Sequence, residues 1–269
     1  MSRPIAVAAT AAFGADVLER LASRHEVASV LTRPDAPAGR GRKLVPSAAK
    51  VAAERLGIRT LEPARPEPGL DLGAAVVVAV AYGLIVPESM LEERLWLNVH
   101  PSLLPRWRGA APVERALMAG DAETGVTIIR LVKELDAGPI AAQGRFAIAP
   151  EDDAGAVYER SADLAVGLLD RVLAESWQPA FLEQEGEATN AAKITTDERR
   201  LDLTRPPSEL VDQVRALSPH IGARAELHGR SMTIWRARVA GDGSFEPIEV
   251  QPDGSRRMAY DAWLHGLRP

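Results

Sequence analysis

The sequence contains no cysteine, and this absence removes several kinds of chemistry at once. Across its 269 residues, disulfides, thiolate nucleophiles, cysteine-ligated zinc and iron–sulfur clusters are all excluded. Aromatic residues are also scarce, at 4% of the chain, so aliphatic side chains and alanine must fill most of the core. With 46% hydrophobic and 26% charged residues, the composition is that of an ordinary globular protein.

Long apolar runs and an excess of positive charge are missing as well. No stretch approaches the roughly 20 apolar residues of a membrane span. The short run Ile5–Ala9 is typical of a buried strand rather than a signal peptide, so we expect a cytoplasmic protein. The formal net charge of −5 argues against nonspecific nucleic-acid binding over the whole surface, but one local basic patch is compatible with it.

Two kinds of binding motif are also lacking. The stretch 39–43 has neither the third glycine of a dinucleotide fingerprint nor the ending of a P-loop, and the turn 9–14 has no Gly-x-Gly-x-x-Gly pattern. The missing dinucleotide fingerprint argues against NAD binding. Four histidines are scattered without metal-ligand spacing, so we expect no metal site; they are His25, His220, His228 and His265.

The first two-thirds of the chain alternates strand and helix patterns. Such alternation predicts an α/β fold with a Rossmann-like, mostly parallel sheet. Ligands of such sheets bind at the carboxyl ends of the strands, near a switch point in the strand order. The expected strands are 5–9, 27–32, 74–81, 96–100, 125–131 and 143–148, the last pairing with the one before it. The expected helices are 13–21, 47–56 with Ser47 as its N-cap, 87–93, 113–119 and 154–174.

The residue composition changes after residue 182. Residues 183–192 are polar, with glycine and asparagine, and are typical of a linker. One helix, 208–217, and strands at 223–227, 231–239 and 248–251 then follow, separated by glycine-containing turns. We therefore predict an α/β domain over 1–182, a linker over 183–199 and a small, mainly β domain over 200–269.

Two polar side chains lie close together at the end of the predicted strand 96–100. Asn98 and His100 are two positions apart, so both point to the same face of that strand. An amide beside an imidazole suits the stabilisation of a developing oxyanion. Asp136, in the loop 135–139, is a candidate to orient His100 or stabilise its charge. The alternative is that His100 is structural and Asp136 an ordinary turn residue.

The segment 33–43 is a loop rich in proline, glycine and arginine, and it concentrates positive charge. Its charged residues are Arg33, Arg40, Arg42 and Lys43 against Asp35 alone, a local excess of three positive charges. This pattern favours contact with phosphates, and the glycines allow close approach of the backbone. The alternative is a merely solvated loop.

The string Asn98-Val99-His100-Pro101-Ser102-Leu103-Leu104-Pro105 resembles the signature of the formyltetrahydrofolate-dependent formyltransferases. Three further segments, 33–44, 106–112 and 125–136, are similar to the members of that family that act on methionyl-tRNA, and so is the tail 250–266. The resemblance covers nearly the whole chain. It implies a cytoplasmic, monomeric enzyme that transfers the formyl group of 10-formyltetrahydrofolate to the α-amine of methionyl initiator tRNA for translation initiation.

The resemblance also implies roles for particular residues. Asn98, His100 and Asp136 match the catalytic residues of the family. Contact with the folate co-substrate is implied for Tyr82, Gly83, Ser102, Leu103, Leu104 and Pro105. The loop residues Arg33, Arg40, Arg42 and Lys43 match the insert with which the family grips the tRNA acceptor end, and no metal is implied.

The sequence departs from the family pattern at two places. Residues 9–13 read Ala-Thr-Ala-Ala-Phe, where the family usually has Gly-Thr-Pro-Glu-Phe. The C-terminal domain, an OB-like barrel in the family, lacks an internal strand or two between 240 and 248, so we expect it to be shortened and open. Two other functions stay compatible with the residues: formylation of an amino-sugar nucleotide or other small amine, and a non-catalytic tRNA- or folate-binding protein.

Overall fold

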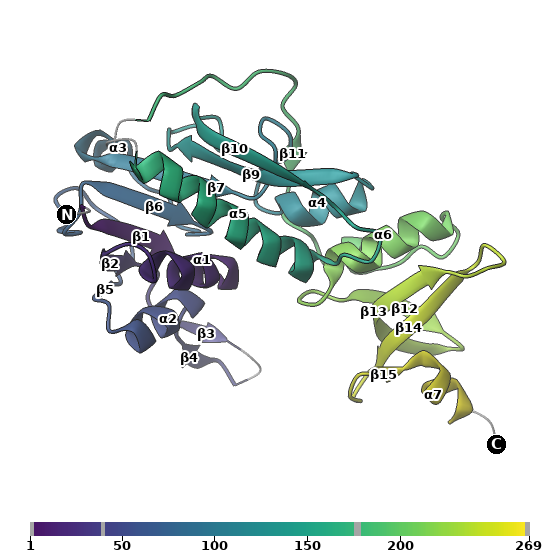
Figure 1. Ribbon diagram of the computed structural model, residues 1–269. Helices are drawn as coiled ribbons and strands as arrows, with labels where there is room; N and C mark the ends of the chain where they lie inside the picture. Colours follow the sequence, from purple (N-terminus) through teal and green to yellow (C-terminus); the bar gives the residue numbers. More distant parts are fainter. Residues whose placement is uncertain (1–2, 39–40, 175–178, 267–269) are drawn as a thin grey trace. The chain divides into compact units, whose positions relative to one another are not determined.

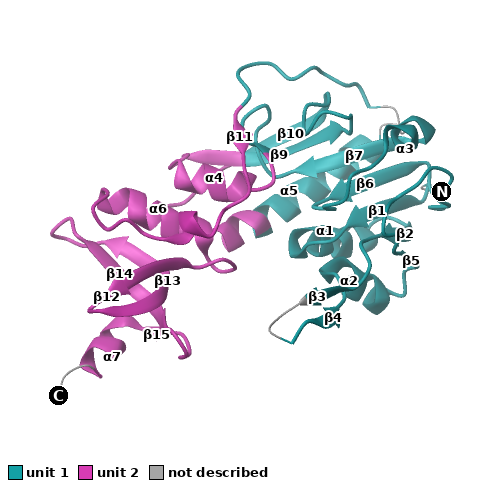
Figure 2. Cartoon of the chain, turned by 180° about the vertical axis from the view of Figure 1, so that it is seen from behind, with its two compact units in different colours: residues 1–108, 125–145, 159–188 teal, residues 109–124, 146–158, 189–269 magenta. Residues whose placement is uncertain are grey.

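The computed structural model describes residues 3–38, 41–174 and 179–266, which fold into two compact units. The first unit comprises residues 1–108, 125–145 and 159–188, and the second comprises 109–124, 146–158 and 189–269 (Figure 2). The second unit therefore takes two segments from the middle of the chain. The division into 1–182, 183–199 and 200–269 stays a prediction. Within the described residues, no helix is long and apolar enough to cross a membrane.

Seven strands form the main sheet, and most of its pairs are parallel (Figure 1). β1 lies between β2 and β6 and is parallel to both, and β6–β7 and β2–β5 are also parallel, whereas β7–β9 is antiparallel. The predicted Rossmann-like, mostly parallel sheet is thus confirmed. In spatial order the strands are β10 (Ile140–Ala147), β9 (Glu123–Arg130), β7 (Leu95–His100), β6 (Val76–Val80), β1 (Ile5–Ala9), β2 (Val27–Leu31) and β5 (Thr60–Leu61).

The two central strands are apolar along their whole length because both faces of the sheet are covered. All five residues of β1 and of β6 are buried. Alternate β1 residues Ile5 and Val7 pack into one apolar cluster, while Ala6 and Ala8 pack into another with Trp96. This division follows from the two-residue period of a strand.

The helices of the first unit include one, α2, that has recognisable signals at both ends. They are α1 (Ala12–Ala22), α2 (Ala48–Leu56), α3 (Glu88–Glu93) and most of α5 (Ala154–Ala174). The predicted N-cap of α2 is confirmed, because the Ser47 hydroxyl accepts a hydrogen bond from the Lys50 N–H at 3.0 Å. At the other end of α2, Gly57 adopts a left-handed conformation with φ of 69°, which glycine tolerates best.

The segment 33–43, predicted as a plain loop, is partly a hairpin. β3 (Ala36–Ala38) pairs antiparallel with β4 (Lys43–Val45), with Ala36 opposite Val45. The prediction missed these strands because they are held by backbone pairing and carry no alternation of buried and exposed residues. Arg40, one of the predicted basic residues, lies outside the described residues.

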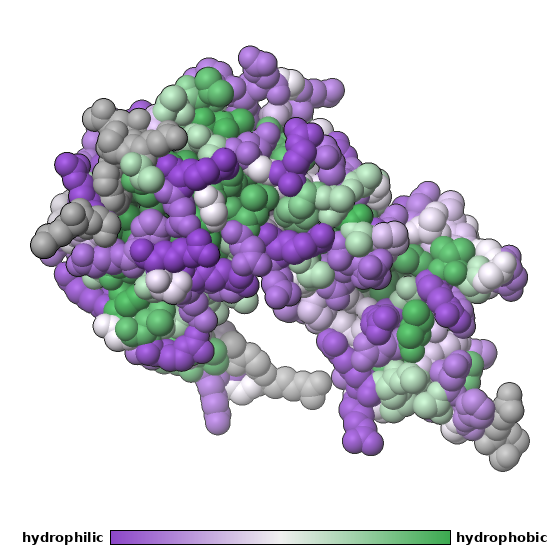
Figure 3. Space-filling model, viewed as in Figure 1, coloured by the Kyte–Doolittle hydropathy of each residue, from purple (hydrophilic) through white to green (hydrophobic). Residues whose placement is uncertain are grey.

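The second unit carries a small antiparallel sheet, as the sequence predicted. Its strands follow the linear order β12 (Ala223–Leu227), β13 (Arg230–Val239), β14 (Phe245–Pro252) and β15 (Met258–Ala259). Leu210, Ile234 and Trp263 contribute to its core. The remaining elements are β8 (Arg108–Gly109), α4 (Pro112–Met118), β11 (Asn190–Ala191), the 3-10 helix η1 (Asp197–Arg199), α6 (Pro207–Leu217) and α7 (Tyr260–His265). Polar residues cover most of the face drawn in Figure 3.

Candidate active site

β7 places two of the predicted catalytic side chains at the carboxyl edge of the main sheet. Asn98 and His100 occupy alternate positions at the end of this strand, and they lie opposite Ile129 and Thr127 of β9. His100 is only 4% exposed, so its ring is held within the protein rather than in free solvent. The strand period therefore does place the amide and the imidazole on one face.

The structure brings Asp136 to both of these side chains. The Asn98 Nδ2 donates a hydrogen bond to the Asp136 Oδ1 at 3.2 Å, and the His100 Nδ1 lies 3.5 Å from the other carboxylate oxygen. Asp136 is 8% exposed and has a φ of 49°, a left-handed conformation that aspartate adopts more readily than most residues. The three residues thus form one compact cluster inside the first unit.

The second nitrogen of His100 is also engaged. Its Nε2 lies 2.8 Å from the carbonyl oxygen of Trp107. Because a carbonyl oxygen can only accept, Nε2 must carry the hydrogen. On the other side Nδ1 faces a carboxylate, which also accepts. Nε2 is therefore the donor to Trp107, and Nδ1 lies within ion-pair distance of the Asp136 carboxylate.

Hydrogen bonds to β9 and β10 fix the loop Ser102–Pro105 that follows β7. The Thr127 hydroxyl donates to the Ser102 carbonyl at 2.7 Å and accepts from the Leu104 N–H at 3.1 Å. Gln143 donates to the Leu104 carbonyl at 3.0 Å and to the Thr127 hydroxyl at 2.9 Å. The sequence alone did not predict a role for Thr127 or Gln143. The signal that could have pointed to Thr127 is its place as a polar residue between the apolar residues of β9.

The predicted folate-contact residues differ in exposure. Ser102 is fully buried, and its hydroxyl donates to the Arg106 carbonyl at 2.7 Å, so it braces the loop from within. Leu104 is 4% exposed, whereas Leu103 and Pro105 are half-buried. A folate contact by this loop stays a prediction.

Tyr82 and Gly83 follow β6, the strand next to β7. The Tyr82 carbonyl accepts a hydrogen bond from the Thr10 hydroxyl at 2.6 Å, which ties the loops after β6 and β1 together at the switch point. The Tyr82 side chain is 5% exposed, and its hydroxyl has no hydrogen-bond partner within the described residues. Burial raises the pKa of this phenol above its ordinary value.

The structure describes three of the four predicted tRNA-contact residues. Arg33 is half-buried and donates to the Pro34 carbonyl, whereas Arg42 and Lys43 are exposed. Asp35, the one acidic residue of the loop, is paired with Lys50 at 2.9 Å. This pair and the contact of Lys50 with Glu62 raise the pKa of Lys50 to about 12.

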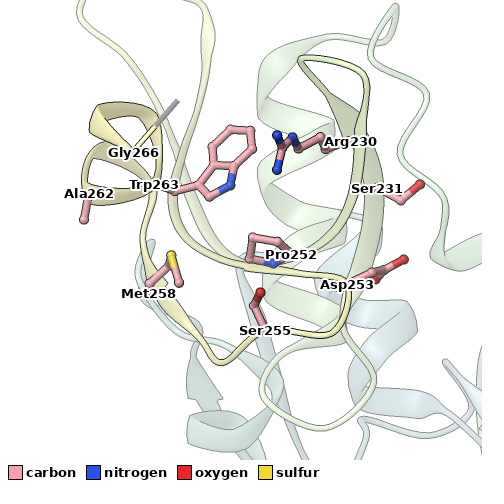
Figure 4. A pocket seen from close by; sticks show the side chains of 9 residues that line it. All are labelled: Arg230, Ser231, Pro252, Asp253, Ser255, Met258, Ala262, Trp263 and Gly266. Atoms are coloured by element: carbon pink, nitrogen blue, oxygen red, sulfur yellow. The ribbon is translucent and has the colours of Figure 1, made fainter. Parts of the chain in front are cut away.

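A separate hollow of about 620 Å³ lies in the second unit, and none of the predicted site residues lines it. Figure 4 shows the Arg230 and Trp263 side chains next to Pro252 on its wall. Trp263 is itself 8% exposed and stacks on Tyr260, so its ring serves mainly to pack α7. Within the described residues, no group of three or more histidine, aspartate or glutamate side chains is placed to hold a metal ion.

A Rossmann-like sheet with an amide, an imidazole and a carboxylate gathered at its carboxyl edge defines an α/β protein with a polar candidate active site. Comparison with known families specifies the class further. The model of the formyl transferase domain matches residues 4–173, and that of the formyl transferase C-terminal domain matches 193–245. The chain belongs to the formyl transferase family.

Relatives of similar length support this assignment. The methionyl-tRNA formyltransferase of Paracoccus denitrificans is 38% identical over 95% of this chain and 94% of its own. That of a Methylobacterium species is 42% identical over 91% and 89%. Among solved structures, HypX from Aquifex aeolicus aligns with a TM-score of 0.69 at 18% identity, covering 98% of this chain and 49% of its own. This chain spans about half the length of HypX, and the likeness shows the fold alone.

Proposed function

We propose that this enzyme transfers the formyl group of 10-formyltetrahydrofolate to the α-amine of methionine esterified to initiator tRNA. The observation that carries the proposal is the cluster of Asn98, His100 and Asp136, joined by contacts of 3.2 and 3.5 Å at the carboxyl edge of the sheet. Near-full-length relatives named methionyl-tRNA formyltransferase support the choice of the methionyl amine as the acceptor. We further propose a cytoplasmic monomer with the active site in the α/β domain.

The residues around β6 and β7 suit a folate substrate. Tyr82 and Gly83 would hold it from one loop, and residues 102–105 from the next. The Tyr82 hydroxyl fits this role, because it is buried without a hydrogen-bond partner within the described part of the chain. Buried polar groups without partners are rare in native proteins, and in this proposal an atom of the folate is the partner of this hydroxyl. When bound, the folate supplies a formyl carbonyl whose oxygen gains negative charge as the amine adds.

Asn98 and His100 stabilise that negative charge. An amide nitrogen carries two hydrogens, and only one of those on Asn98 is used in its bond to Asp136, so the other is available to the oxyanion. When protonated, His100 adds a positive charge in a buried setting, where electrostatic stabilisation is strong. Asp136 holds both groups and is placed to assist removal of the amine proton as the amine nitrogen bonds to the formyl carbon. The bond from that carbon to N10 of the folate then breaks, N10 takes up a proton, and tetrahydrofolate leaves. No covalent enzyme intermediate is required.

The hairpin β3–β4 would contact the tRNA. Pairing with Lys50 offsets the negative charge of Asp35, so the positive charges of the exposed Arg42 and Lys43 determine the net charge of this loop. An exposed arginine that contacts a phosphate contributes about one unit to the salt dependence of binding. We therefore expect Arg42→Ala to weaken tRNA binding and to flatten the dependence of affinity on salt. A flat dependence in the wild type would favour a small amine as the substrate.

The direct test is formyl transfer from 10-formyltetrahydrofolate to charged initiator tRNA, followed as formylmethionyl-tRNA. Wild-type protein is expected to be active and His100→Ala to lose nearly all of this activity. Folate binding without formylation of the tRNA would refute methionyl-tRNA as the acceptor, and an amino-sugar nucleotide would then be tested. If His100→Ala formylates the tRNA as fast as the wild type does, the proposed role of the imidazole is wrong.

A further inference from the structure

Gln184 connects the polar segment after α5 to the loop that carries Asp136. Its side-chain amide donates two hydrogen bonds of 2.8 Å, one to the Asp136 carbonyl and one to the Gly138 carbonyl. Gln184 stands near the start of the predicted linker, and the sequence predicted no role for it. Its position in the structure is half-buried, against the main chain of the candidate active site.

The other end of the same amide is held by Arg108. The Arg108 Nε and Nη2 donate to the Gln184 Oε1 at 3.1 and 2.6 Å. Arg108 directly follows Trp107, whose carbonyl accepts the hydrogen bond from His100. The chain of contacts thus runs from His100 through 107–108 and Gln184 to Asp136, and back to His100 through the carboxylate.

The Asp136 loop is exposed to solvent along one side. Residues 133–135 are exposed, and Leu135 alone is 71% exposed, so apolar packing does not anchor this side of the loop. At its far end the loop is tied to β9, because the Arg130 N–H donates to the Pro139 carbonyl at 2.9 Å. Between these parts, Asp136 must keep its left-handed conformation, which costs free energy in a non-glycine residue.

We propose that Gln184, held by Arg108, is a positioning residue that keeps the Asp136 carboxylate facing Asn98 and His100. The inference rests on the proposed function. A primary amide is required for chemical reasons, because the group must donate twice to carbonyls and accept from a guanidinium at the same time. Glutamate can accept from Arg108 but, when ionised, cannot donate to the two carbonyls.

The test compares Gln184→Glu and Gln184→Ala with Glu183→Ala and Glu185→Ala, two exposed neighbours in the same segment. Loss of a supporting hydrogen bond and a displacement of the order of 1 Å reduce turnover by about ten- to a hundredfold. We expect that loss in kcat for both Gln184 variants, with KM for folate and tRNA nearly unchanged. The two controls should retain wild-type kcat.

The pH profile provides a readout that a merely structural role would not change. A protonated glutamate regains one donor, so the activity of Gln184→Glu relative to wild type should rise as the pH falls toward the ordinary glutamate pKa of about 4.3. Gln184→Ala has no such group and should show no relative gain. If both Gln184 variants turn over like the Glu183→Ala control, the proposal is wrong.

A spectroscopic measurement separates this proposal from the proposed function. Ring ¹⁵N signals of His100, assigned with the His100→Ala variant, report the surroundings of the imidazole without any substrate. They should shift in Gln184→Ala and stay unchanged in Glu183→Ala, even if the wild-type protein formylates another amine. Unchanged His100 signals in both would overturn the positioning role, and a wild type inactive with methionyl-tRNA would overturn the proposed function alone.

Discussion

Asn98 offers the sharpest test of the chemistry at the scale of a single residue. Its amide donates one hydrogen to Asp136 and has a second for the oxyanion. Replacement by alanine removes that donor, and the loss of one such donor typically lowers kcat by about 10²- to 10³-fold. We expect Asn98→Ala to show this loss in single-turnover formyl transfer, while binding of folate persists.

Asn98→Asp is the matched control for this prediction. It keeps the size of the side chain but places a second carboxylate beside Asp136 and His100, so it should be at least as inactive as the alanine variant. A loss smaller than tenfold in Asn98→Ala would contradict the oxyanion role, since the remaining groups would then supply the stabilisation by themselves.

The same residues show how far sequence reasoning extends. The two-residue period of a strand was sufficient to place Asn98 and His100 on one face, and the geometry agrees. No role could be predicted from the sequence for Thr127 and Gln184, because each acts through contacts with residues distant in the sequence. A period describes which face a side chain occupies, and it contains no information on which loop folds back against that face.

At the scale of elements, helix α2 depends on its N-cap residue, Ser47. The Ser47 hydroxyl caps the helix at Lys50 N–H and also shares a hydrogen bond of 2.6 Å with the buried Thr32 hydroxyl. Loss of a serine N-cap costs about 0.5–2 kcal/mol. We expect Ser47→Ala to lower the free energy of unfolding by about that amount in urea titrations. Ser47→Thr keeps the hydroxyl and should lose less, and equal losses would contradict the capping role.

Predicted and observed elements agree best where one physical cue dominates. The bounds of β1 and α5 match the predicted ranges 5–9 and 154–174, because a continuous apolar run and a long helical period leave few alternatives. The hairpin β3–β4 was missed because its residues carry no such period and its stability comes from backbone pairing. The part of the chain that would meet the tRNA is therefore the part that local patterns describe least well.

At the scale of the whole molecule, the order of segments along the chain is not their order in space. Residues 109–124 and 146–158 fold with the C-terminal part, although the family model of the N-terminal domain runs from 4 to 173. α4 supplies Val113 and Leu117 to an apolar cluster that also contains Ala216 of α6. A sequence division at a single point cannot express this packing, because residues from separate stretches complete the same core.

The stability of the second unit should depend on pH through Glu114 of α4. Burial raises the pKa of Glu114 above its ordinary value, although the Tyr158 hydroxyl donates to both of its oxygens at 3.1 and 3.2 Å. The folded state then binds more protons than the unfolded state between the two pKa values, so the free energy of unfolding falls as the pH rises through that window.

Glu114→Gln is neutral at all pH values and can still accept a hydrogen bond from Tyr158. We therefore expect it to be more stable than wild type at pH 7 and to lose this advantage near pH 4, as urea midpoints would show. Exposed Glu185→Gln is the control, and an advantage independent of pH would contradict the titration of Glu114 as its cause.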